Sequence, residues 1–112
     1  MKYRNFANGK EKLSALGLGC MGMSFAYGPT DDVESIATLE RSLELGINFW
    51  DTADMYGDGA NERLISKVLV PNRNKIFLAT KFGFRWKEDG KSNYIDVSPE
   101  YMYQAVENLS NV

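Results

Sequence analysis

The 112-residue sequence has no histidine and a single cysteine, Cys20. The absence of histidine removes the side chain that most often serves as a general acid, a general base or a metal ligand. One cysteine cannot form an internal disulfide, and a zinc site built from the usual cysteine and histidine ligands is not expected. A chain with so little cysteine is typical of a reducing compartment, so we expect a cytoplasmic protein.

Long apolar runs and basic runs are missing as well. No apolar segment approaches the roughly 20 residues needed to cross a bilayer, and the polar stretch Met1–Lys12 lacks the apolar centre of a signal peptide. The 13 basic and 15 acidic residues give a net charge of -2 without any basic stripe. We therefore expect neither nucleic acid nor a membrane as a partner. The apolar content of 44% is that of an ordinary soluble domain.

The first residues carry the signals of a β-hairpin. Asn8-Gly9 is typical of a two-residue hairpin turn, and it lies between Tyr3–Phe6 and Leu13–Leu18. The second arm of this hairpin is expected to run on toward Gly19.

Three helices are predicted from capping residues and apolar stripes. Asp31 is expected to cap a helix that ends near Leu45, before Gly46 at the C′ position. Asn61 is expected to cap a second helix that Pro71 ends, and Ser98 a third. The apolar faces of the three helices are, in order, Val33, Ile36, Leu39 and Leu43; Leu64, Ile65, Val68 and Leu69; and Met102, Ala105, Val106 and Leu109.

Strands alternate with these helices. They are expected to begin near residues 16, 47 and 76, and a polar connection is expected from Arg85 to Asp96. Alternating strands and helices predict a parallel α/β sheet. The spacing of about 30 residues suits a (β/α)₈ barrel, in which a unit averages about 31 residues, but a doubly wound sheet has similar units.

The segment Gly17–Gly22 matches the pattern G-x-G-x-x-G of dinucleotide-binding Rossmann folds. In that fold the third glycine lies in the opening turn of a helix whose N-terminus faces the pyrophosphate. Here Gly28-Pro29 prevents a helix directly after the glycines, and the first helix cap comes only at Asp31. We therefore interpret the segment as a glycine-rich strand exit whose backbone a planar group can approach closely.

Three chemically suited side chains follow two neighbouring strands. Asp51 comes directly after the strand Ile47–Trp50, Tyr56 lies in the next loop, and Lys81 comes directly after Ile76–Thr80. In a parallel barrel these positions share one face. Carbonyl reduction requires a proton donor for the developing alkoxide, and an ammonium group near a phenol lowers the pKa of the phenol. A buried lysine needs a counter-ion, which Asp51 could supply, and the hydride must come from a cofactor.

The residues Asp51-Thr52-Ala53-Asp54-Met55-Tyr56-Gly57 resemble the D-T-A-x-x-Y-G signature of the aldo-keto reductases. Gly59–Leu64 is similar to the continuation of that signature, and Thr80-Lys81 to the third-strand motif of the family. The resemblance implies the N-terminal part of a (β/α)₈ TIM barrel, in which a β-hairpin is followed by about three βα units. It also implies NADPH-dependent reduction of an aldehyde or ketone.

By motif position, the resemblance makes Tyr56 the proton donor, Lys81 the residue that tunes it, and Asp51 the partner of Lys81. Gly22 and Met23 would lie against the nicotinamide, and Asp51 could also reach its ribose. Phe25, Phe84 and Trp86 are weaker candidates for the wall of the substrate pocket.

The sequence departs from the family pattern after the third predicted helix. The histidine that completes the family tetrad follows the fourth strand, and Asn108–Val112 differs from the usual lead into that strand. We therefore expect residues 1–112 to be a partial domain, truncated before strand four and inactive alone. The alternative is a non-catalytic interaction protein whose half-barrel self-associates through its exposed edge.

Overall fold

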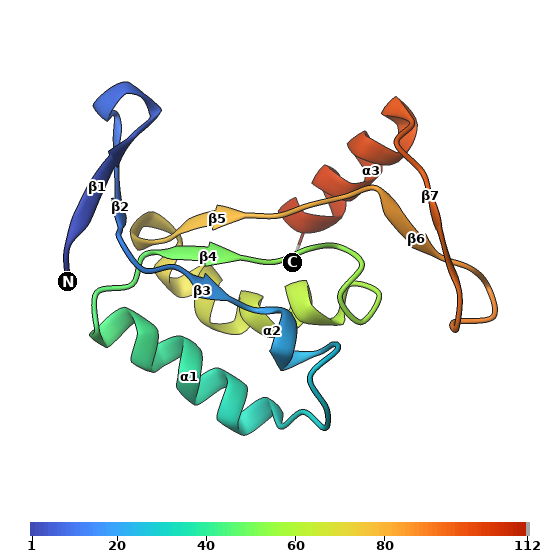
Figure 1. Cartoon of the computed structure of the whole chain (residues 1–112), viewed down its shortest axis with the longest axis horizontal. Coiled ribbons are helices and arrows are strands. Elements are labelled where there is room, and N and C mark those ends of the chain that lie inside the picture. The colour runs from blue at the N-terminus through green and yellow to red at the C-terminus, as the bar shows by residue number, and fades with distance from the viewer. Residues whose placement is uncertain (112) are drawn as a thin grey trace.

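The computed structural model describes residues 1–111 and is built around a three-stranded parallel sheet (Figure 1). Its strands are β3 (Leu18–Gly19), β4 (Phe49–Asp51) and β5 (Phe77–Ala79), paired in the order β3-β4-β5. Gly19 pairs with Asp51, and Asp51 with Ala79. The carboxyl ends of the three strands therefore meet at one edge, which is the condition for a shared site.

An antiparallel hairpin precedes the sheet, as predicted. It consists of β1 (Tyr3–Phe6) and β2 (Glu11–Ser14), joined by a 3₁₀ turn at Ala7–Gly9. The prediction of a two-residue turn is wrong, because pairing ends at Phe6 and Glu11 and leaves residues 7–10 in the loop. The second strand also ends at Ser14, where its N–H donates to the Asn48 side chain at 2.7 Å.

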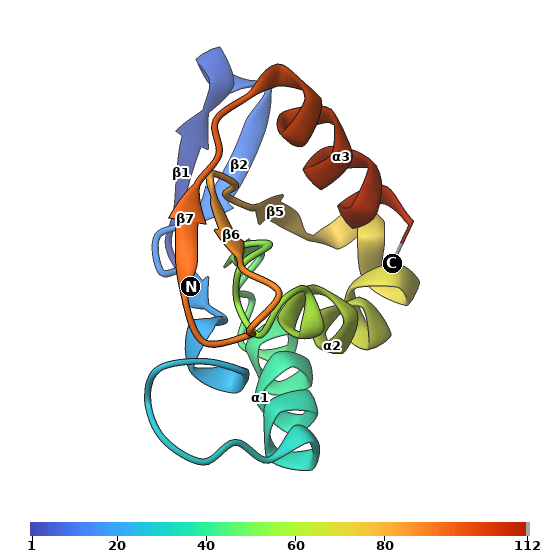
Figure 2. The ribbon, with the colours of Figure 1, turned by 90° about the vertical axis from the view of Figure 1, so that its right-hand side faces the viewer.

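The helices α1 (Asp32–Glu44) and α2 (Ala60–Leu69) pack side by side on the same face of the sheet. The third helix, α3 (Pro99–Ser110), continues the series along one side of the strands (Figure 2). A doubly wound sheet carries helices on both faces, whereas a barrel carries them all outside. The arrangement is therefore that of a barrel segment.

The core lies between the sheet and the first two helices. Trp50 is fully buried there, and its Nε1 donates to Ser42 Oγ of α1 at 3.1 Å. Because neighbouring strand residues face opposite sides, Phe49 and Asp51 point away from these helices. Phe49 meets Phe77 there at a ring distance of 6.0 Å, and Phe6 of the hairpin packs on Phe77 at 5.5 Å. The buried apolar residues of the core are Cys20, Met23, Leu39, Trp50, Leu64, Ile65, Val68, Leu69 and Ile76.

The segment after Gly22 is not the helix of a Rossmann fold. A single 3₁₀ turn, Met21–Met23, is followed by bends until α1 begins at Asp32. The Rossmann alternative is therefore excluded by the local backbone.

Two predicted helix caps are confirmed. The Asp31 carboxylate accepts from the N–H groups of Val33 and Glu34, and Ser98 Oγ accepts from the N–H of Tyr101. The third is wrong: Gly59, at a φ of 78°, is the N-cap of α2, and Asn61 lies inside its first turn. A 3₁₀ segment, Val70–Lys75, follows α2 and contains Pro71.

The predicted apolar faces are confirmed for α2 and only in part for α1 and α3. Val33 is 79% exposed, because about 100° per residue places it roughly 120° around the helix from buried Leu39. Two small buried residues, Ser35 and Ser42, flank Leu39 instead. In α3 only Ala105 is buried, and Val106 is 55% exposed.

The polar connection expected from Arg85 to Asp96 contains a second hairpin. Its strands are β6 (Phe84–Trp86) and β7 (Asn93–Ile95), which pair antiparallel outside the main sheet. An ion pair between Arg85 and Asp96 at 3.0 Å closes its base.

Candidate active site

Asp51, Tyr56 and Lys81 meet at the carboxyl edge of the sheet. Lys81 Nζ lies 2.8 Å from Asp51 Oδ2 and donates to the carbonyl oxygen of Thr52 at 2.6 Å. The same nitrogen lies 5.4 Å from the centre of the Tyr56 ring. The structure thus brings together all three side chains that the sequence singled out, from the exits of β4 and β5.

The ion pair is more open to solvent than a buried lysine would be. The side chains of Lys81 and Asp51 are 49% and 47% exposed. The idea of a buried lysine kept charged by its counter-ion is therefore not supported. In this setting Asp51 fixes the position of the ammonium group, and the pair contributes little to stability.

One aromatic ring stacks on Tyr56, and a second packs against the first. The Phe25 ring is stacked on the Tyr56 ring at 6.1 Å and 13°, and Trp86 meets Phe25 edge-on at 6.1 Å. Trp86 Nε1 also donates to the carbonyl oxygen of Met55 at 2.8 Å, so β6 is tied to the Tyr56 loop. Phe84 and Trp86 both line a neighbouring cavity of about 400 Å³, together with Asp54 and Tyr101.

The turn after β3 supplies the predicted cofactor residues. Gly22 is exposed, whereas the Met23 side chain is buried in the core. Gly19, which pairs with Asp51, has no atom within 4 Å of the place where a Cβ would lie. Gly19 is therefore exposed beside Asp51.

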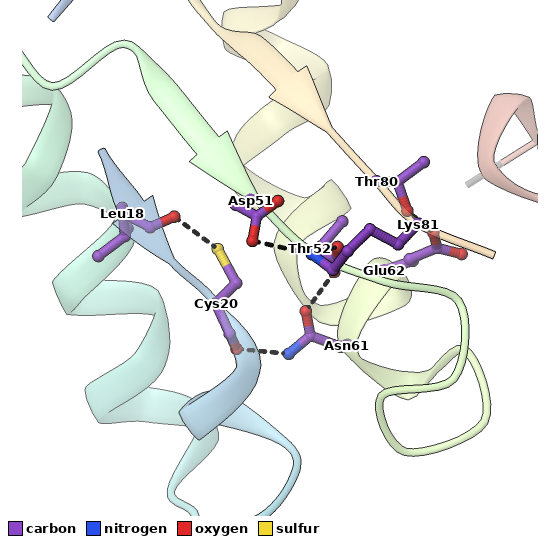
Figure 3. Close-up of polar contacts among 8 residues, drawn as sticks. All are labelled: Leu18, Cys20, Asp51, Thr52, Asn61, Glu62, Thr80 and Lys81. Atoms are coloured by element: carbon purple, nitrogen blue, oxygen red, sulfur yellow. Dashed lines mark hydrogen bonds and ion pairs between the residues drawn. The ribbon is translucent and has the colours of Figure 1, made fainter. Parts of the chain in front are cut away.

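The sequence did not identify the polar residues that connect these segments (Figure 3). Asn61 is fully buried: its Oδ1 accepts from Thr52 Oγ1 at 2.6 Å, and its Nδ2 donates to the carbonyl oxygen of Cys20 at 2.7 Å. Glu62 is also buried and accepts from Thr80 Oγ1 at 3.0 Å. The first turn of α2 is thereby bonded to the exits of all three strands.

Three titratable groups beside the site have shifted pKa values. Burial raises the pKa of the Cys20 thiol to about 12, and the charge of Asp51 acts in the same direction. Burial also raises the pKa of Asp54, although the hydrogen bond from the Tyr101 hydroxyl to Asp54 Oδ2 opposes this. Burial and that same bond raise the pKa of Tyr101.

The fold is that of a (β/α)₈ barrel segment in which three polar side chains meet at the carboxyl edge of the strands. The model of the aldo/keto reductase family matches residues 15–109, so the chain belongs to that family.

Related sequences and structures agree with this assignment. Aldo-keto reductase yakc (NADP(+)) of Schizosaccharomyces pombe is 38% identical over 101 residues, which are 88% of this chain and 30% of that protein. The uncharacterized oxidoreductase YqkF of Bacillus subtilis is 36% identical over 95% of this chain and 33% of its own length. The holo form of aldo-keto reductase AKR11C1 from Bacillus halodurans superposes with a TM-score of 0.86 at 36% identity, over 99% of this chain and 36% of that one. The chain therefore spans about one third of the length of these relatives.

Neither a membrane-spanning helix nor a metal site is found within residues 1–111. Within residues 1–111, no helix has the length and apolar character required to span a membrane. No group of acidic and cysteine side chains in the same range is arranged to hold a metal ion.

Proposed function

We propose that this chain carries the proton-donating part of an NADPH-dependent reduction of aldehydes or ketones. Tyr56 is the acid that protonates the carbonyl oxygen as it gains negative charge. The observation that carries the proposal is the position of the Lys81 ammonium group, which lies 5.4 Å from the centre of the Tyr56 ring. Asp51 and the Thr52 carbonyl hold it there by accepting from its Nζ.

Each residue has a distinct role in this proposal. The Lys81 ammonium group lies beside the Tyr56 ring, where its positive charge would stabilise the negative charge that develops during the reduction. Asp51 and the Thr52 carbonyl hold Lys81 in place by accepting from its Nζ. Phe25, stacked on Tyr56, restricts the ring and shields one side of it from water.

The cofactor is proposed to be NADPH, which would supply the hydride when bound. The exposed backbone at Gly19 beside Asp51 is where we propose the nicotinamide end, and Gly22 and Met23 follow in the next turn of the chain. The S. pombe relative carries NADP(+) in its name, which supports the same choice. We further propose a small carbonyl compound as the partner and the cytoplasm as the location.

A chimera tests this function, because the chain spans only a third of its relatives. Residues 15–109 would replace the matching segment of the S. pombe enzyme, and aldehyde-dependent oxidation of NADPH would be followed. We expect turnover in the chimera and a loss of at least about 100-fold in Tyr56→Phe, since general acids contribute that much or more. Tyr103→Phe, an exposed tyrosine on α3, is the matched control and should retain full activity.

A folded Tyr56→Phe chimera that binds NADPH and turns over as fast as the unsubstituted chimera would contradict the role of Tyr56. We expect the isolated 112 residues to show no measurable turnover. Clear activity of the isolated chain that disappears in Tyr56→Phe would overturn that second expectation.

A second candidate function is a non-catalytic protein that self-associates. One observation favours it: β5 has a strand partner on one side only within residues 1–111. Such edges offer free N–H and C=O groups to another chain. Light scattering separates the two functions, since a monodisperse oligomer of defined size favours the association function, whereas aggregation without a defined size favours a fragment of an enzyme.

A further inference from the structure

Asn61 sits where the three segments of the candidate site converge. It is fully buried, and its side-chain hydrogen bonds reach residues far away in the sequence. Its amide orientation is fixed by chemistry, because the Cys20 carbonyl oxygen can only accept and so must face Nδ2. The opposite atom, Oδ1, therefore faces the Thr52 hydroxyl, which donates to it at 2.6 Å.

The Oδ1 atom of Asn61 is connected to Lys81 through Thr52. The hydroxyl of Thr52 is held by Asn61, while the carbonyl oxygen of the same residue accepts from Lys81 Nζ at 2.6 Å. Thr52 has no exposed surface, so its peptide group cannot exchange these partners for water. Because the Thr52 side chain is fixed, its carbonyl group has one orientation, and the hydrogen bond to that carbonyl sets the position of the Lys81 ammonium group.

The Nδ2 atom of Asn61 is bonded to the turn after β3. Asn61 Nδ2 donates to the Cys20 carbonyl oxygen at 2.7 Å and to Ser24 Oγ at 3.1 Å. These two residues bracket Gly22 and Met23, the segment proposed to border the nicotinamide. One buried amide thus lies between the lysine and the cofactor segment (Figure 3).

We propose that Asn61 is a positioning residue that sets Lys81 and the Cys20–Ser24 turn relative to each other through Thr52 on one side and Cys20 on the other. The importance of the relative position of Lys81 and the Cys20–Ser24 turn rests on the proposed function, but that position can be measured without turnover.

Lysine acetylation of the full 112-residue chain provides the test. Acetic anhydride reacts with free amines, and mass spectrometry gives the rate at each lysine separately. In the parent chain, Lys81 should react at least about fivefold more slowly than Lys67 on the surface of α2, because Lys81 Nζ is held by two acceptors. Equal rates at Lys81 and Lys67 in the folded parent would overturn the proposal at once.

Variants at Thr52 separate positioning from general stability. Thr52→Val removes only the hydroxyl and should raise the ratio of Lys81 to Lys67 acetylation at least about threefold. Thr52→Ser restores a hydroxyl and should return the ratio to the parent value. An unchanged ratio in a Thr52→Val chain with the parent circular dichroism, or an equal rise in Thr52→Ser, would refute the proposal. Ser66→Ala, which alters an exposed hydroxyl on the same helix as Asn61, is the control and should have no effect.

Asn61→Leu should act on both sides. It should raise the Lys81 ratio and also speed hydrogen exchange at the Met23 amide, which donates to the Cys20 carbonyl at 3.1 Å. Faster exchange at Met23 without release of Lys81 would contradict the link between the two. If Lys81 responds as expected while the chimera shows no turnover, the positioning stands and the proposed reaction falls.

Discussion

Cys20 shows how a single side chain near the site is silenced by its surroundings. The thiol is fully buried, and its pKa of about 12 keeps it protonated at neutral pH. Thiolate is the reactive form, so we expect Cys20 to react with a disulfide reagent at pH 8 at least about 100-fold more slowly in the folded chain than in urea. Rapid labelling of the native chain would show that the turn after β3 opens readily.

Asp54 contributes a pH dependence of the opposite sign to that of a usual salt-bridged carboxylate. Its pKa is raised above 3.8 by burial, so the folded chain holds the proton more tightly than the unfolded chain. The free energy of unfolding therefore falls as the pH rises from about 4 through the raised pKa. Buried Glu62, with a pKa raised for the same reason, adds to this fall.

Two substitutions test this assignment in opposite directions. Asp54→Asn removes the titration and should make the fall in unfolding free energy between about pH 4 and 7 smaller. Tyr101→Phe removes a hydrogen bond that lowers the pKa of Asp54, and it should make the fall steeper. Urea unfolding across this pH range measures both slopes, and slopes identical to that of the parent would contradict the role of Asp54.

At the scale of elements, α1 depends on its N-cap. Asp31 accepts from two N–H groups of the first turn, at 2.8 and 3.1 Å. Asp31→Ala should lower the free energy of unfolding by about 1 kcal/mol, whereas Asp31→Asn keeps an acceptor and should stay close to the parent. Urea unfolding followed by circular dichroism distinguishes the two variants. Equal losses would mean that charge, rather than the hydrogen bonds, stabilises the helix end.

Elements set by local signals were predictable, and those set by distant partners were not. Asp31, Ser98 and the left-handed Gly46 act on neighbouring residues, so the sequence pattern placed them correctly. Asn61 has the chemistry of a helix cap, but the chain turns earlier, at Gly59. The amide of Asn61 is then used by Thr52 and Cys20, 9 and 41 residues away along the chain.

The β6–β7 hairpin escaped prediction for a related reason. Its strands are short, lie outside the main sheet and bury little, so the usual apolar alternation is weak. Arg85 stabilises it by pairing with Asp96 and by lying 4.5 Å from the centre of the Tyr101 ring. Neither contact has a signature in the local sequence.

At the scale of the whole molecule, the alternation of strands and helices left barrel and doubly wound sheet equally open. The one-sided placement of α1 and α2 decides between them, in agreement with the barrel that the aldo-keto reductase resemblance implied. The Asp51–Lys81 pairing was predictable because parallel strands end at one edge and because the motif positions implied it. The half-exposed state of that pair depends on what covers the sheet, which the sequence pattern does not reveal.

The face of the sheet opposite the helices is expected to drive association of the isolated chain. Phe6 is 51% exposed there and packs on Phe77. Phe6→Lys should lower the average mass measured by light scattering at high protein concentration. Val33→Lys, on the far side of α1, is the control and should not lower it. Equal effects of the two would indicate non-specific aggregation through exposed apolar groups.

The two tryptophans lie in different surroundings, and this makes the chain its own optical reporter. Trp50 is sealed in the core, so its emission should be blue-shifted and should follow unfolding. Trp86 is partly exposed and lies beside Phe25, which stacks on Tyr56. Reduced nicotinamide absorbs where indole emits, so a bound cofactor would quench Trp86 by energy transfer. A Trp86→Phe chain would emit from Trp50 alone, so its spectrum would report on the core without the contribution of the partly exposed indole.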